Sequence, residues 1–102
     1  MGNLLVLPEI AAVHHEMVAI RHHIHAHPEL GFNEFATGDL VAKLLTEWGY
    51  QVTRHIGQTG VVATLQRGVG KSLGLRADMD ALPIEETSGL PYASTHSGVM
   101  HA

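Results

Sequence analysis

The feature that most constrains the fold is a change in hydrophobic periodicity near Gly49. Before it, apolar residues recur every three or four positions, which is typical of one face of a helix. After it, apolar and polar residues alternate, which is typical of half-buried strands. Because helical faces of this kind must pack on another layer, the sequence predicts an α/β fold with two amino-terminal helices followed by three strands.

Two helices are expected in the first half of the chain. Pro8 suits the first helical turn, and Pro28 pushes the preceding residue out of helical geometry, so the first helix should span residues 8–25. The second should cover residues 35–48, with Asn33 as its amino-terminal cap and Gly49 as a left-handed carboxy-terminal cap. The first helix carries a single apolar stripe of Ile10, Val13, Met17, Ile20 and Ile24.

Three strands are expected after Gly49, over residues 51–56, 61–66 and 72–78. The short turn at residues 57–60 should join the first two strands into a hairpin. Two helices and three strands make an incomplete layer, and its open sheet edge would require further strands from elsewhere.

Composition excludes several classes of function. The net charge is -4 with only six Lys and Arg residues, whereas a nucleic-acid surface needs clustered cations. The chain has no basic amphipathic face and no run of about 18 apolar residues, so nothing in it indicates binding to a membrane or crossing of one. The apolar run Met1 to Leu7 lacks a basic start, so no signal peptide is expected. With no cysteine present, we expect a cytoplasmic protein.

Histidines are dense in the first helix, with four of the chain's nine between His22 and His27. His15-Glu16 begins a zinc-protease motif, but the second histidine should stand at position 19, which is Ala19. His23 and His27 are four apart and could share a helix face. We expect most of these histidines to face solvent or an interface, while a small histidine-rich metal binder stays open as a hypothesis.

Two acidic residues directly follow the third expected strand. Asp78 and Asp80 stand where the carboxyl end of a strand meets a ligand crevice in α/β sheets. They are therefore candidates for a site that holds a cation, and a turn with one capping and one solvated Asp is the alternative. Glu85 and Glu86 come next and are expected to be solvated charges.

Three segments together resemble, in order and spacing, the start of the hippurate hydrolase family. They are Ile24–Phe32, Gly74–Ile84 and Gly98–Ala102, and the run Arg-Ala-Asp-Met-Asp-Ala-Leu-Pro is the most specific part. The family includes N-acyl-amino-acid amidohydrolases and belongs to the aminoacylase and carboxypeptidase superfamily of metallopeptidases. The resemblance covers nearly the whole chain.

The resemblance implies metal-dependent hydrolysis of the amide bond of small N-acyl amino acids. It implies a helix-flanked mixed-sheet catalytic domain with a two-metal site of zinc, manganese, cobalt or nickel, where the metals activate a water. Residues 1–102 would be the amino-terminal part of that domain, without the smaller inserted domain. Assembly of the parent into a homo-oligomer is left open.

Only a few residues of this chain match positions that have a known role in the family. Asp80 matches an acidic residue that supports the metal centre without binding metal directly. Asp78 and His101 are expected near the site, and no direct metal ligand is expected within this chain. We therefore expect the isolated chain to be inactive, the alternative being a non-catalytic interaction module that requires a complementing strand or partner.

Overall fold

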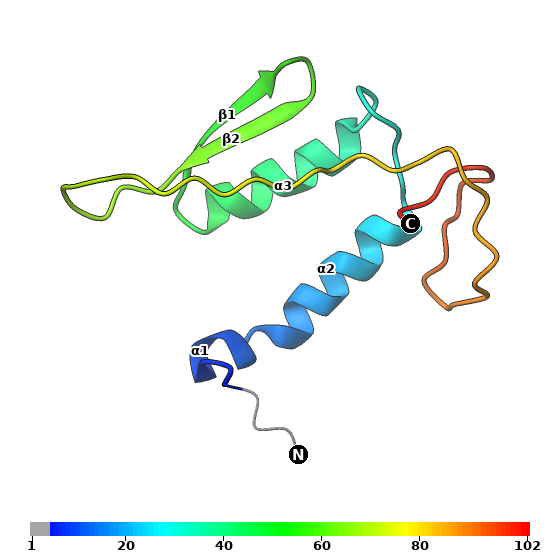
Figure 1. Cartoon of the computed structure of the whole chain (residues 1–102), viewed down its shortest axis with the longest axis horizontal. Helices are drawn as coiled ribbons and strands as arrows, with labels where there is room; N and C mark the ends of the chain where they lie inside the picture. Colours follow the sequence, from blue (N-terminus) through cyan, green and yellow to red (C-terminus); the bar gives the residue numbers. More distant parts are fainter. Residues whose placement is uncertain (1–4) are drawn as a thin grey trace.

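The computed structural model describes residues 5–102, so the first four residues of the apolar amino-terminal run lie outside the described part. The elements are α1 (Pro8–Ala11), α2 (His14–Ala26), α3 (Phe35–Glu47), β1 (Gln51–Ile56) and β2 (Gly60–Thr64). Helices precede strands as expected, and the α/β class is confirmed. Figure 1 shows α3 between the β1–β2 hairpin on one side and α2 on the other, and the carboxyl end of α2 lines a small hollow together with the first turns of α3.

The expected first helix is divided into α1 and α2. Val13 leaves helical geometry, with φ -104° and ψ 8°, and its N–H donates to the carbonyl of Ile10 rather than four residues back. Residues 11–13 contain neither Gly nor Pro, so no residue type marks this break. The carboxyl end follows the prediction, because α2 stops two residues before Pro28.

The second expected helix is confirmed as α3, and Gly49 terminates it as expected. Gly49 has φ +91°, and its N–H bonds to the carbonyl of Thr46 while the Tyr50 N–H bonds to that of Leu45. This pair of bonds satisfies carbonyls that the last helical turn leaves free.

The amino-terminal cap of α3 differs from the prediction, because Asn33 does not cap it. The Glu29 carboxylate takes that role: one oxygen accepts from the Thr37 N–H at 2.7 Å and hydroxyl at 2.6 Å, the other from the Ala36 N–H at 3.1 Å. A carboxylate at this end is also favoured by the helix dipole.

The sheet consists of one antiparallel hairpin, β1–β2, with Val52 opposite Ala63 and an irregularity between Arg54 and Ile56. It packs on α3 at Gly38, where an added Cβ would stand 3.4 Å from the Thr59 carbonyl and the Arg54 guanidinium. The close approach explains a glycine inside a helix, where it costs about 1 kcal/mol.

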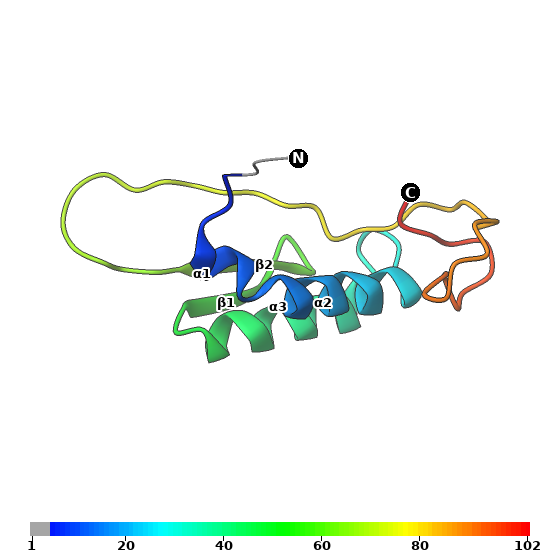
Figure 2. The ribbon, with the colours of Figure 1, turned by 90° about the horizontal axis from the view of Figure 1, so that it is seen from below.

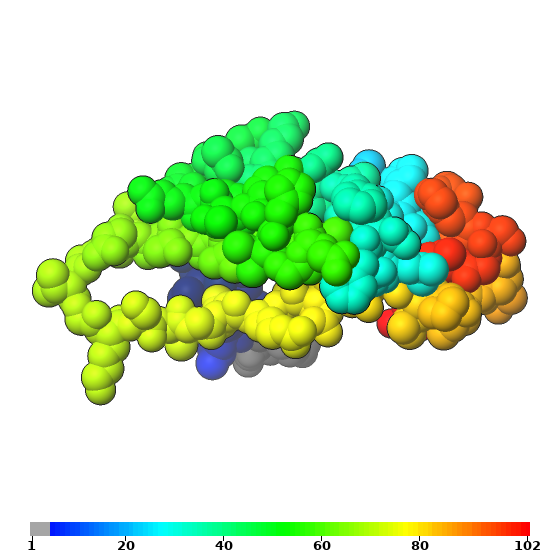
Figure 3. Space-filling view, turned by 90° about the horizontal axis from the view of Figure 1, so that it is seen from above, coloured from blue at the N-terminus to red at the C-terminus, as the bar shows by residue number. Residues whose placement is uncertain are grey.

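The predicted third strand, residues 72–78, does not form. These residues pair with no strand in the described structure, and Leu73 and Leu75 are 87% and 92% exposed. The physical reason is the absence of a neighbour, since a strand is stable only when its N–H and C=O groups are paired. Figure 3 shows an open gap between the loop around residue 70 and the rest of the molecule.

The described chain exposes more surface than a closed domain of its size. Its accessible area is 7931 Å², against about 5,600 Å² for a folded monomer of this mass. Its radius of gyration is 16.0 Å, against about 13 Å for a compact domain of this length. The stripe on α1 and α2 is half-exposed, and Figure 2 shows the 65–80 segment arching away from the helices.

None of the helices described over residues 5–102 is long and apolar enough to cross a membrane.

Candidate functional site

Three segments far apart in the sequence meet at the carboxyl end of α2. The Ala81 N–H donates to the Glu29 carbonyl at 2.8 Å, and Leu82 and Met100 exchange two backbone hydrogen bonds at 2.9 and 3.0 Å. These bonds place residues 29–30, 80–82 and 100–101 side by side, and Figure 1 shows the carboxyl terminus beside the end of α2. The backbone therefore gathers Asp80 and His101 in one place.

Asp80 is exposed and lies against the loop that follows α2. An added Cβ on Gly31 would stand 3.8 Å from its Oδ2, so a glycine there leaves room for the carboxylate. Asp78 is bound differently: its Oδ1 accepts from Arg76 Nη2 at 2.8 Å, and both side chains are largely exposed. The two carboxylates thus have different partners.

His101 is the least satisfied polar side chain of this region. Its Nε2 is buried and has no hydrogen-bond partner within the described chain. Burial lowers the pKa of His101, the charge of His25 lowers it further, and Asp80 acts in the opposite direction. Burial therefore favours the neutral form of the ring, and its Nε2 has no partner among the described residues.

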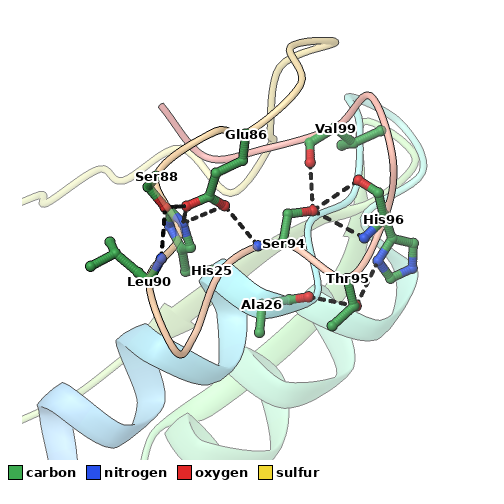
Figure 4. A network of polar contacts seen from close by, with 9 residues as sticks. All are labelled: His25, Ala26, Glu86, Ser88, Leu90, Ser94, Thr95, His96 and Val99. Carbon is green, nitrogen blue, oxygen red and sulfur yellow. Dashed lines mark hydrogen bonds and ion pairs between the residues drawn. The ribbon is translucent and has the colours of Figure 1, made fainter.

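Glu86 is the centre of the polar network drawn in Figure 4. The expectation that its carboxylate is solvated is wrong. Its side chain is only 3% exposed, and Oε1 accepts from His25 Nε2 at 3.0 Å and from the Ser94 N–H at 2.7 Å. Oε2 accepts from the Ser88 hydroxyl and, at 3.1 Å, from His25 Nε2. The Ser88 hydroxyl, then the Ser94 N–H, outweigh burial and with His25 lower the pKa of Glu86 to about 2.

Glu85 is exposed, as expected, and its carboxylate also organises the neighbouring turn. Its Oε1 accepts from the Ser97 hydroxyl at 3.0 Å and from the Gly98 N–H at 2.7 Å. Thr95 anchors the same segment on α2, because its N–H and hydroxyl both donate to the Ala26 carbonyl. Side chains that the sequence pattern assigned to solvent thus fix the 83–102 segment.

The histidines divide between this network and the surface. His22 stacks on Tyr92 with ring centroids 3.7 Å apart, and His25 meets the edge of the same ring at 5.6 Å. His23 and His27 share a face, as their spacing allowed, with centroids 4.7 Å apart. Over residues 5–102 no group of three or more His, Asp or Glu side chains stands close enough to hold a metal ion.

An open hollow lies elsewhere on the described surface, between α3 and β1. It is open to solvent, and its charged lining is already paired: Arg54 Nη2 lies 2.7 Å from Asp39 Oδ1 and Lys43 Nζ lies 3.9 Å from Glu47 Oε2. The Nε of Arg54 is buried there without a hydrogen-bond partner in the described chain, but its guanidinium charge is already paired with Asp39, so the candidate site is placed at Asp80 and His101 instead.

Curated relatives match nearly the whole chain. It is 53% identical over 98 residues to a hippurate hydrolase of Campylobacter jejuni, covering 95% of this chain and 26% of that protein. It is 42% identical to an N-acyl-L-amino acid amidohydrolase of Geobacillus stearothermophilus, covering 85% of this chain and 24% of that protein. No family model matches. The chain thus spans about a quarter of the length of these relatives.

A solved structure supports the same relationship. The crystal structure of a dinuclear metal-binding peptidase of the M20 family from Bacillus subtilis matches with a TM-score of 0.81 and 38% identity. The match covers 89% of this chain and 26% of the peptidase. The resemblance drawn from the three segments is confirmed in both sequence and fold.

Proposed function

Because this chain belongs, over the length that it shares, to the family of hippurate hydrolases, N-acyl-amino-acid amidohydrolases and M20 peptidases, we propose that it forms the amino-terminal part of the catalytic domain of such an enzyme. The proposed reaction is hydrolysis of the amide bond of a small N-acyl amino acid with the help of a divalent metal. The 53% identity to a hippurate hydrolase over 95% of the chain carries this proposal.

The described residues do not by themselves fit a complete metal cage. Asp80 and His101 offer an oxygen and a nitrogen at one place, but no third ligand stands with them in the described part of the chain. We propose that Asp80 supports a metal centre whose direct ligands come from other residues, and that zinc, manganese, cobalt or nickel occupies it. In this role the Asp80 carboxylate would orient a metal-binding group by accepting its hydrogen bond.

The excess surface supports a place within a larger domain. Unpaired backbone over residues 72–78 and the half-exposed apolar stripe of α1 and α2 are surfaces that a catalytic domain would cover with further strands and helices. The isolated chain should therefore neither hydrolyse hippurate nor bind metal tightly.

A chimaera tests the proposal directly. This chain would replace the matching segment of the Campylobacter jejuni hippurate hydrolase, and release of glycine from hippurate would be measured with added Mn²⁺ or Zn²⁺. We expect metal-dependent turnover by the chimaera and none by the isolated chain. A chimaera that folds and binds metal but does not hydrolyse hippurate would contradict the proposed function.

Two variants of the chimaera test the role of Asp80. Asp80→Asn should lower kcat/KM by about 10- to 100-fold, the range for groups that orient metal ligands. Asp39→Asn is the matched control, because Asp39 is exposed on α3 and pairs only with Arg54. Equal activity of the Asp80 variant and the parent chimaera would contradict the proposed role of Asp80.

A further inference from the structure

We propose that Glu86 is a positioning residue: its carboxylate joins α2 to the 83–102 segment and thereby holds His101 beside Asp80. Its contribution to hydrolysis rests on the proposed function, whereas the joint itself is a property of this chain alone. Nothing in the resemblance drawn from the sequence assigns a role to this residue.

The first step of the argument is the set of donors that meet at Glu86. A carboxylate that is 3% exposed has lost its water and must be satisfied by protein donors. His25 Nε2 reaches it from α2, and the Ser94 N–H and Ser88 hydroxyl reach it from the 83–102 segment. The Glu86 carboxylate therefore accepts hydrogen bonds both from its own segment and from His25, which lies 61 residues away in the sequence.

The second step leads from Glu86 to His101 through Ser94. The Ser94 N–H is bound to Glu86, and its hydroxyl lies 2.6 Å from the Val99 carbonyl and 2.9 Å from that of His96. Val99 stands two residues before His101, and Met100 between them is paired with Leu82. Figure 4 shows this line of contacts from Glu86 through Ser94 to Val99.

The third step concerns what surrounds the His101 ring. His25 faces it from α2, with centroids 6.4 Å apart, and Asp80 acts on it from the 80–82 segment. Because Glu86 holds His25 through Nε2, it also sets the distance between the two rings. Without that hold, the 83–102 segment would stay attached to α2 through Thr95 and the Tyr92 ring, but His25 would be free to turn and the buried Nε2 of His101 would become more accessible to water.

The isosteric variant Glu86→Gln should break this arrangement with little change in shape. Both carboxylate oxygens accept hydrogen bonds, whereas a glutamine has one acceptor oxygen and an NH₂ group that would face a donor. Glu85→Gln is the matched control, because it removes the same charge one residue away. Its amide oxygen can still accept from Ser97 and Gly98, since both bonds go to one oxygen, Oε1, of Glu85.

The experiment is NMR on the isolated chain, without metal or substrate, so that its outcome is independent of the proposed hydrolysis. In Glu86→Gln we expect the pKa of His101 to rise toward its ordinary value and the Ser94 amide to exchange about tenfold faster. Glu85→Gln should leave both unchanged, and the amide shifts of β1 and β2 report whether each variant is folded.

An unchanged His101 titration and Ser94 exchange in a folded Glu86→Gln chain would overturn the proposal, as would equal effects of Glu85→Gln. Ser94→Ala keeps the contact between its N–H and Glu86 and removes the hydroxyl contacts to Val99 and His96. It should move the His101 titration in the same direction by a smaller amount. If Glu86→Gln does not fold, an unchanged His101 titration in Ser94→Ala would refute the proposed connection from Glu86 to His101 instead.

Discussion

Removing the Glu29 carboxylate should open α3 at its amino-terminal end. In Glu29→Ala the N–H groups of Ala36 and Thr37 and the Thr37 hydroxyl lose their acceptor. Loss of a capping side chain costs about 0.5–2 kcal/mol, and loss of a negative charge at a helix amino terminus about 0.3–1 kcal/mol. Together these give about 1–3 kcal/mol, a large share of the about 5–15 kcal/mol that stabilises a chain of this length.

Amide hydrogen exchange over α3 measures this loss directly. Because 1.4 kcal/mol is tenfold in an equilibrium constant, the α3 amides should exchange about 5- to 100-fold faster in Glu29→Ala. Glu47→Ala is the matched control at the other end of α3, where Glu47 is 54% exposed and lies 3.9 Å from Lys43. Its exchange should stay within about twofold of the parent, since an exposed pair of this kind contributes little.

The effect should depend on pH with a defined sign. Burial raises the pKa of Glu29, but the hydrogen bonds from Thr37 and Ala36 outweigh it, so the folded pKa lies below the ordinary 4.5. The folded state therefore binds fewer protons than the unfolded state below that value, and stability rises with pH there. The difference between parent and variant should be complete above pH 4.5 and disappear as the pH falls through the folded pKa. Equal protection of α3 in both chains at neutral pH would refute the capping role.

Two further predictions concern the hairpin. Gly60→Ala places a Cβ 2.5 Å from the Ile56 carbonyl and should destabilise the β1–β2 pairing by about 2 kcal/mol, seen as faster exchange of its amides. Gly74→Ala, where no atom lies within 4 Å, is its control, and equal effects would contradict the close approach. A double-mutant cycle on Asp39 and Arg54, 2.7 Å apart but partly exposed, should give a coupling of less than about 1 kcal/mol that shrinks with added salt; a larger, salt-independent coupling would contradict this.

The ends of the helices were predictable where a proline or a glycine allows only one backbone conformation. Pro28 stops α2 within two residues, and Gly49 adopts the positive φ that ends α3. The cap of α3 was not predictable in the same way, because Glu29 stands six residues before Phe35 and reaches back across a loop. Local patterns for capping search the residue next to the helix and miss such an acceptor.

The strand over residues 72–78 shows a second limit. Its apolar alternation indicates residues suited to a buried sheet, but a strand also requires neighbours on which to pair. Within the described chain none is present, so the same residues lie extended and exposed. The pattern indicates what the segment is suited for, whereas a strand forms only when a neighbouring strand pairs with it, and the described residues supply none.

The network at Glu86 shows why the candidate site was only partly predictable. Asp80 was chosen as a candidate because an expected strand and a proline turn flank it and because the resemblance points to it. Glu86 follows no such element and binds His25 across 61 residues. Its neighbour Glu85 has an identical local setting and a different set of partners. Nothing in the spacing separates the two, because only the folded path of residues 83–102 decides which carboxylate meets α2.

In this chain, the contacts that stabilise the fold differ from those that position the candidate site residues. The buried apolar side chains of the described residues are small, namely Ala42, Ala81 and Pro28, so little hydrophobic burial stabilises the described chain. Hydrogen bonds, by contrast, concentrate where residues 29–30, 80–82 and 86–101 meet α2, and they involve charged acceptors on Glu85 and Glu86. Such bonds are directional and fix orientation more than they add free energy. The arrangement therefore fits a segment that determines where Asp80 and His101 lie.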